Sequence, residues 1–198
     1  MKAAAIYIPT CIQTVWQIYC IGDSLMANGE VESRLTTLLG TWPIVKNKGV
    51  GGQNSTQILS RFTTDIITPR NAKYVIIWAG INDAQTDVLA TTAEANLQSM
   101  YTAAYNAGIK VVSVNLSCFK DDGNWNAGRQ AILDAINTWI ASTAININYR
   151  IDVNTLLTDP GNAYQLLPAY DGGNHIHLTT AGYDVVAGAI YAGVTWTL

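Results

Sequence analysis

The sequence predicts an α/β protein of three layers, in which helices cover both faces of a parallel β-sheet. Two observations lead to this fold class. Short runs rich in β-branched and aromatic residues alternate with segments of helical period, and the runs are continuously apolar, as in strands buried on both faces. In addition, no low-complexity linker or internal repeat interrupts the 198 residues. We therefore expect a single domain over residues 1–198.

Five short runs are expected to form the strands, because β-branched and aromatic side chains pack well on a pleated, half-buried surface. In chain order they are Trp16–Ile21, Trp42–Val45, Tyr74–Ala79, Lys110–Asn115 and Ile147–Val153. Residues 1–15 precede the first run, and we expect them to form an extra N-terminal strand or an extension.

Five helices are expected between and after the strands, because apolar residues recur at the three-to-four spacing of one helical face. The first two, with weaker periodicity, are Glu30–Leu39 and Ser55–Ile66. The apolar faces of the later three consist of Leu97, Met100, Tyr101, Ala104 and Tyr105, then Ile132, Ala135, Ile136, Trp139 and Ile140, then Tyr183, Val186, Ala187, Ile190 and Tyr191. Thr91 and Glu94 predict a capping box at the start of the third helix, and Gly108 predicts its end.

The composition excludes several classes of function. Charged residues make up only 13% of the chain and the net charge is −3, so we expect no nucleic-acid-binding face. No uninterrupted apolar stretch of about 20 residues is present, so we expect no membrane span. Pro9 interrupts the apolar segment near the N terminus, which argues against a secretory signal peptide. A cytoplasmic protein and a part of a larger secreted protein both remain open.

The three cysteines, Cys11, Cys20 and Cys118, cannot all pair within one chain. They form no C-x-x-C motif and none is near a histidine in sequence, so we expect neither a disulfide framework nor a zinc site. We expect them to be small, buried, hydrophobic side chains.

Glycine-rich and polar segments follow the predicted strands at their carboxyl ends, where ligands bind in parallel α/β sheets. Gly22–Leu25 reads Gly-Asp-Ser-Leu, a turn that can expose a serine hydroxyl near the N–H groups of a helix start. The loop Asn47–Gly52 follows the second strand and Gly80–Asp83 follows the third. Both histidines of the chain, His175 and His177, come just before the last helix. A serine, two candidate oxyanion donors and a histidine therefore occur in order along the chain.

These segments resemble the sequence blocks of the SGNH (GDSL-type) hydrolase family, and the resemblance covers roughly residues 16–191. It rests on Gly22–Leu25, Gly49–Gly52, Gly80–Asp83 and the region around His177. The resemblance implies a flavodoxin-like fold with five parallel strands in the order 2-1-3-4-5. It also implies hydrolysis of esters without a metal ion or other cofactor.

Carried over by residue, the resemblance implies Ser24 as the nucleophile and His177 as the general base. The backbone N–H groups of Ser24 and Gly52 and the side-chain amide of Asn82 would form the oxyanion hole. A serine hydroxyl is a weak nucleophile at neutral pH, so His177 must take its proton during attack. An acyl-enzyme then forms, the alcohol leaves, and water repeats the sequence.

The chain departs from the family pattern at Asn174, which stands where the family usually has an aspartate three residues before the catalytic histidine. In a serine protease, an Asp-to-Asn change at the equivalent place lowers turnover about 10⁴-fold, partly through the wrong histidine tautomer. Three interpretations are open. The carbonyl of Asn174, or one of the main chain, orients His177 in a Ser–His dyad; Asp171 serves as a substitute acid; or the site is impaired.

The sequence thus predicts a serine hydrolase of short-chain, acetyl-type carboxylic esters, because the chain has no long insertion to form a lid. The expected substrate is a small-molecule or acetylated carbohydrate ester, and 10 Tyr and 6 Trp against 2 Phe suit such a cleft. The alternative is a weak or inactive carbohydrate-binding or assembly module on the same fold. We expect Asp23 and Asp83 to accept hydrogen bonds at their turns, and His175 to contact the substrate edge or the surface.

Overall fold

The computed structural model describes residues 16–40 and 43–197. The predicted N-terminal strand or extension, Cys11 and the expected start of the second strand at Trp42 lie outside these residues. Five parallel strands form one sheet in the order β2-β1-β3-β4-β5, which confirms the predicted order. The strands are β1 (Gln17–Gly22), β2 (Ile44–Gly49), β3 (Ala72–Trp78), β4 (Lys110–Val114) and β5 (Tyr149–Ile151).

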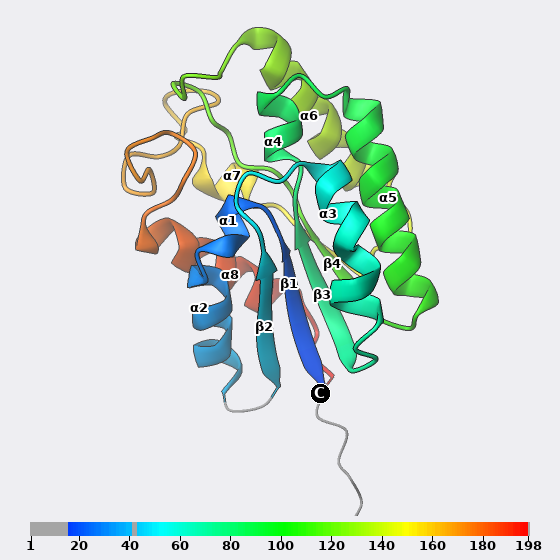
Figure 1. Cartoon of the computed structure of the whole chain (residues 1–198). Coiled ribbons are helices and arrows are strands. Elements are labelled where there is room, and N and C mark those ends of the chain that lie inside the picture. Colours follow the sequence, from blue (N-terminus) through cyan, green and yellow to red (C-terminus); the bar gives the residue numbers. More distant parts are fainter. Residues whose placement is uncertain (1–15, 41–42, 198) are drawn as a thin grey trace, which may run out of the picture.

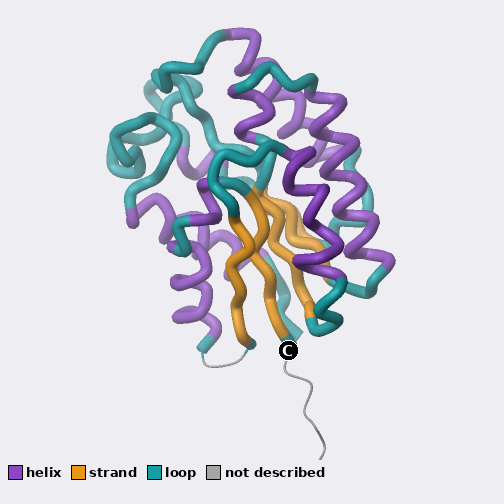
Figure 2. Tube along the Cα trace, viewed as in Figure 1, coloured by secondary structure: helices purple, strands orange, loops and turns teal. Residues whose placement is uncertain are grey.

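Helices surround the sheet (Figures 1 and 2). They are α1 (Ser24–Ala27), α2 (Glu30–Leu39), α3 (Ser55–Phe62), the π-helical turn η1 (Thr63–Ile67), α4 (Ile81–Gln85), α5 (Ala90–Asn106), α6 (Ala127–Ser142), α7 (Asn154–Leu157) and α8 (Thr180–Gly193). Helix α2 packs against α8, whereas α3 packs against α5 and α5 against α6. These two groups of helices form the outer layers, and the fold is of the predicted three-layer α/β class.

The core packs around the three inner strands, β1, β3 and β4, in each of which all residues but one are buried. Cys20 in β1 and Cys118 after β4 are buried free thiols, as predicted for the two cysteines that the structure describes. No helix of the described residues is long and apolar enough to cross a membrane.

Strand β2 differs from its predicted range, because it continues through three polar residues to Gly49. Among the described residues it is an edge strand and pairs only with β1. Residues after Val45 are half-buried or exposed, and such a strand tolerates lysine and asparagine that a central strand would exclude. The prediction, which relied on apolar residues alone, therefore ended this strand too early.

The predicted capping box of the third long helix is wrong. Helix α5 begins after Leu89, and no side chain caps its start. Its predicted end is confirmed at Gly108, which has φ of +75°. The N–H of Ile109 bonds to the carbonyl of Ala104 and the N–H of Gly108 to that of Tyr105, the paired bonds of a Schellman motif.

Candidate active site

Ser24 lies at the carboxyl end of β1, where the strand turns into helix α1. Gly22 ends the strand and pairs with Trp78 of β3, so closely that a Cβ atom at Gly22 would lie 2.1 Å from the Trp78 carbonyl oxygen. Only glycine fits there. Asp23 caps the helix and Ser24 is its first residue, so the Ser24 N–H has no acceptor within the helix.

His177 lies on the segment before α8 and reaches Ser24 across the end of the sheet. Its Nε2 is 2.9 Å from Ser24 Oγ, although 153 residues separate the two. The segment is held by an isolated bridge between Asp171 and Leu178 and by the Gly172 N–H, which donates to the His177 carbonyl at 2.8 Å. The residues expected as nucleophile and base are thus within hydrogen-bond distance of each other.

Asn174 contacts His177 in the orientation opposite to the one expected from the sequence. Its Oδ1 accepts the backbone N–H groups of His177 and Ile176, at 2.9 and 3.3 Å. Its Nδ2 therefore faces His177 Nδ1, at 2.7 Å. The expectation that the Asn174 carbonyl accepts the ring N–H is wrong, because backbone donors already occupy that oxygen.

This orientation selects one tautomer of the neutral His177 ring. An amide NH₂ group only donates, so His177 Nδ1 must accept and the ring proton resides on Nε2. Nε2 then donates to the Ser24 hydroxyl instead of accepting its proton. Proton abstraction requires the other tautomer, with the Asn174 amide rotated or displaced.

Asp171, the candidate substitute acid, is hydrogen-bonded to the ring of His175 and not to that of His177. Its Oδ2 is 2.6 Å from His175 Nδ1, and its Oδ1 accepts the backbone N–H groups of Gly173 and His175, at 2.8 and 3.0 Å. Burial raises the pKa of the Asp171 carboxyl, but these N–H donors and the His175 ring outweigh it, so the pKa is lowered overall. The charged carboxylate is therefore already bound to the neighbouring histidine.

The other expected oxyanion donors, Gly52 and Asn82, lie on the turn after β2 and in helix α4. Residues Val50–Gln53 form a turn in which the Gln53 N–H donates to the Val50 carbonyl and Gly52 has φ of +75°, a value that favours glycine. A Cβ atom on Gly51 would lie 3.9 Å from Ser24 Cβ, so the turn passes close to the serine. Asn82, in α4, donates through Nδ2 to the Gln53 carbonyl at 2.9 Å, which fixes the amide against this turn.

The arrangement fits a comparison with known proteins. The sequence matches the GDSL-like lipase/acylhydrolase family over residues 20–185. The chain belongs to this family. No curated protein sequence matches it. Among solved structures, a GDSL-like lipase from Bacteroides thetaiotaomicron VPI-5482 superposes with a TM-score of 0.76 at 22% identity, covering 91% of this chain and 88% of that one.

Two further solved structures share the fold of this GDSL-like hydrolase. LAE5, an alpha/beta hydrolase enzyme from the metagenome of Lake Arreo, has a TM-score of 0.74 at 20% identity and covers 89% of this chain and 94% of that one. Axe2-W215I, an acetyl xylan esterase from Geobacillus stearothermophilus, has a TM-score of 0.71 at 18% identity and covers 92% and 97%. At these identities the similarity shows the fold alone.

Asp23, the residue before Ser24 in this GDSL-like chain, is a buried acid. Its Oδ1 accepts the N–H of Leu25 at 3.0 Å, which confirms its expected role at the turn. Its Oδ2 is buried and has no hydrogen-bond partner among the described residues. Burial raises its pKa to about 7, against the lowering effect of the Leu25 N–H, and the nearby Asp83 carboxylate raises it further.

Asp83 was expected to accept hydrogen bonds at its own turn, but its carboxylate instead binds the start of α3. Its carboxylate accepts the N–H and the hydroxyl of Ser55, at 2.8 and 2.6 Å, and Asn96 donates to the same hydroxyl at 2.9 Å. Ser55 and Asn96, which join the segment after Asn82 to the one after Gly52, were missed in the sequence. They are 28 and 41 residues from their partners, so no local pattern signals them.

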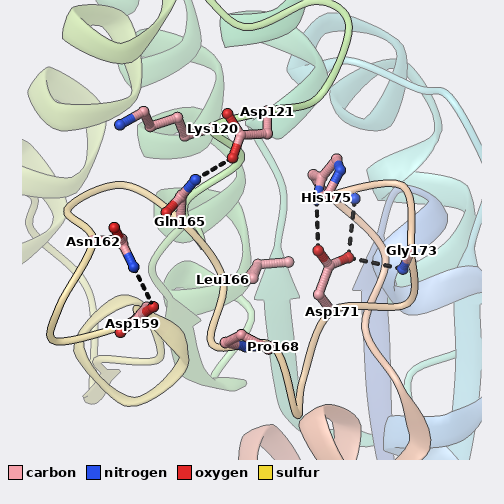
Figure 3. A pocket seen from close by; sticks show the side chains of 10 residues that line it. All are labelled: Lys120, Asp121, Asp159, Asn162, Gln165, Leu166, Pro168, Asp171, Gly173 and His175. Carbon is pink, nitrogen blue, oxygen red and sulfur yellow. Dashed lines mark hydrogen bonds and ion pairs between the residues drawn. The ribbon is translucent and has the colours of Figure 1, made fainter.

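A cavity of about 340 Å³ lies beside the segment 171–177 of this GDSL-like chain (Figure 3). Its walls carry the polar side chains of Lys120, Asp121, Asp159, Asn162, Gln165, Asp171 and His175, together with Leu166, Pro168 and Gly173. Ser24 and His177 do not line it, so it adjoins the Ser24–His177 pair but does not contain it. In the part of the chain that the structure describes, no three His, Cys, Asp or Glu side chains gather as a metal site would require.

Proposed function

We propose that this chain hydrolyses short-chain carboxylic esters through an acyl-enzyme on Ser24, with His177 as the general base. The observation that carries the proposal is the 2.9 Å contact between Ser24 Oγ and His177 Nε2 at the carboxyl end of the sheet. Membership of the GDSL-like acylhydrolase family supports the reaction class.

In this mechanism Ser24 Oγ attacks the ester carbonyl carbon while its proton passes to His177 Nε2. The carbonyl oxygen becomes negatively charged, and the N–H groups of Ser24 and Gly52 and the amide of Asn82 stabilise it. Removing one such donor typically lowers turnover about 10²–10³-fold. The C–O bond of the ester breaks, the alcohol leaves with the proton from His177, and water then cleaves the acyl-enzyme by the same steps.

Asn174 makes this mechanism slow, because the tautomer that it stabilises cannot accept the Ser24 proton. The productive tautomer carries its proton on Nδ1, against the Asn174 NH₂ group. That clash is relieved only when the amide turns away and gives up its two backbone hydrogen bonds. Since Asn174 is exposed, water can replace these partners, so we expect the reaction to be slowed but not abolished.

We further propose that the alcohol part of the substrate is rich in hydroxyl groups, as in an acetylated carbohydrate. The support is the cavity beside the segment 171–177, in which carboxylate, amide and ammonium groups offer both acceptors and donors (Figure 3). One solved structure of similar fold is an acetyl xylan esterase, which is compatible with this substrate class.

The test is a turnover profile over p-nitrophenyl esters of increasing acyl length and over acetylated saccharides, with Ser24→Ala as the control. We expect the highest kcat/KM on acetyl and butyryl esters and loss of turnover in Ser24→Ala. A higher kcat/KM on decanoate or longer esters would contradict the short-chain specificity. Turnover that persists in Ser24→Ala would contradict the mechanism.

The orientation of Asn174 also favours a second candidate, a binding or assembly module that retains the fold without useful turnover. A serine-directed organophosphonate separates the two. Covalent labelling of Ser24, located by mass spectrometry, supports the hydrolase. Absence of labelling at high concentration, together with unchanged saccharide binding in Ser24→Ala, supports the module.

A further inference from the structure

The Arg61 side chain contacts three segments that surround the candidate oxyanion hole, around Gly22, Lys48 and Gln53. It lies in the last turn of α3, and its side chain is only 18% exposed. Helical side chains lean toward the helix N terminus, and here that direction leads to the carboxyl ends of β1 and β2. Four hydrogen bonds hold the guanidinium: Nε to Gln53 Oε1 at 2.6 Å, Nη1 to the Lys48 carbonyl and to Asp65 Oδ2, each at 2.7 Å, and Nη2 to the Gly22 carbonyl at 3.1 Å.

These contacts join the segments that carry all three expected oxyanion donors. Gly22 is the last residue of β1, two positions before Ser24. Lys48 lies two residues before the turn Val50–Gln53, hereafter the glycine turn, and Gln53 comes directly after Gly52. The backbone carbonyl of Gln53, in turn, accepts the side-chain amide of Asn82. The Arg61 guanidinium thus contacts, directly or through Gln53, every segment that carries one of the three expected donors.

Side-chain hydrogen bonds, rather than packing, anchor the glycine turn: Asn82 donates to the Gln53 carbonyl, Asn47 accepts the Gly49 N–H, and Arg61 binds both flanks. A Cβ atom on Gly52 would meet nothing within 4 Å, so packing at this position does not restrict the turn. Arg61 holds it on both sides instead, at the Lys48 carbonyl before the turn and at the Gln53 side chain after it. Hydrogen bonds from a charged guanidinium are stronger than neutral ones.

We propose that Arg61 is a positioning residue for the oxyanion hole: it does not touch the substrate, but it sets the separation of Ser24, Gly52 and Asn82. The proposal rests on the proposed ester hydrolysis. Oxyanion donors are effective only when they are already in place before charge develops. Loss of Arg61 is therefore expected to weaken binding of the transition state and to leave binding of the substrate largely unchanged.

The sharpest variant is Arg61→Lys, which keeps the positive charge but replaces a planar fork by one ammonium group. The ammonium cannot reach three segments in the geometry of the guanidinium. The matched control is Arg34→Lys, which alters an arginine ion-paired with Asp184 on α8, at 3.2 Å. We expect kcat of Arg61→Lys on p-nitrophenyl acetate to fall about 10- to 100-fold, with KM within about threefold, and Arg34→Lys to behave as the unmodified protein.

An NMR measurement makes the test independent of turnover. In Arg61→Lys we expect the backbone amide signals of residues 51–53 and the side-chain amide signals of Asn82 to shift or broaden, while signals of β4 and α6 remain in place. Unchanged signals at these positions overturn the proposal whatever happens to kcat, and so does an unchanged kcat, or a higher KM alone, in a protein that hydrolyses esters. If the unmodified protein neither hydrolyses esters nor is labelled at Ser24, the proposed function fails, and the NMR result alone decides the role of Arg61.

Discussion

His175 and His177 lie two residues apart, and each is held at Nδ1 by a side chain from the residues just before it. For His175 this side chain is the carboxylate of Asp171, at 2.6 Å, and for His177 it is the amide of Asn174, at 2.7 Å. Only His177 reaches Ser24. A carboxylate keeps the proton on Nδ1 and leaves Nε2 free to accept, whereas an amide NH₂ does the reverse. The histidine with the favourable partner is therefore not the histidine at the serine.

The difference shows that contact with Ser24 and a favourable partner at Nδ1 are set by separate residues in this segment. Position follows from the backbone: the bridge of Asp171 with Leu178 and the bond from Gly172 to the His177 carbonyl place the His177 ring at Ser24. The ring tautomer follows from one side chain, Asn174, whose NH₂ group faces His177 Nδ1. The following substitutions test this separation, from the largest expected effect to the smallest.

Substituting each histidine by asparagine tests whether only one of them is catalytic. We expect His177→Asn to lower kcat/KM at least about 10²-fold, since a general base typically contributes 10²–10⁴-fold. We expect His175→Asn to change it less than about threefold. Asparagine suits the control because His175 has φ of +63°, a region that asparagine tolerates. Hydrolysis of p-nitrophenyl acetate measures both, and equal losses would remove the distinction between the two histidines.

Asn174→Asp should convert the weak partner of His177 into a strong one. The carboxylate keeps one oxygen on the two backbone N–H groups and offers the other to His177 Nδ1, which selects the productive tautomer and stabilises the imidazolium. We expect kcat to rise about 10²–10⁴-fold, with no change in the fold by circular dichroism. Asn124→Asp, which adds the same charge on an exposed loop, controls for charge alone. Unchanged kcat in Asn174→Asp would show that the tautomer does not limit the rate.

Asp23, next to Ser24, is an acid whose pKa is shifted upward, to about 7, so it is expected to make the stability of the protein depend on pH. Between about pH 4 and pH 7 the folded state holds a proton that the unfolded state has lost, so the free energy of unfolding falls as pH rises through this window. We expect Asp23→Asn to remove this fall and to gain about 2–4 kcal/mol relative to the unmodified protein between pH 4 and pH 8. Urea unfolding at both pH values measures it, and parallel pH profiles would contradict it.

Asp171 is expected to show the opposite pH dependence and the smallest effect. Its pKa is lowered in the folded state, so its contribution to stability is present above the ordinary pKa and is lost as pH falls through the lowered pKa. We expect Asp171→Asn to cost a few tenths to about 1 kcal/mol at pH 7 and to leave kcat within about threefold. Asp87→Asn is the control, because the pKa of the Asp87 carboxyl is also lowered, by Arg129, and Asp87 does not line the cavity. A kcat loss above about tenfold in Asp171→Asn alone would make Asp171 the acid that supports His177.

Much of the fold could be predicted from the sequence because its signals are local. Helix α2 was predicted at its observed bounds, and the range predicted for α3 continues into η1. Central strands were found because they are continuously apolar. The edge strand β2 and the start of α5 were placed less well, because solvent exposure and uncapped helix ends leave no clear pattern in neighbouring residues.

The sequence by itself determined the α/β class through its periodicity and the family through its block motifs, and the resemblance to that family implied the order of the strands and the candidate site residues. Only the tertiary structure decided the hydrogen bonds among them. Whether Asn174 offers His177 an oxygen or an NH₂ group depends on which backbone N–H groups already occupy that oxygen. Whether Asp171 faces His175 or His177, and whether Arg61 reaches Gly22, depends on the path of the chain through space. Spacing along the chain does not contain these choices, because hydrogen bonds depend on distance and direction in the folded molecule.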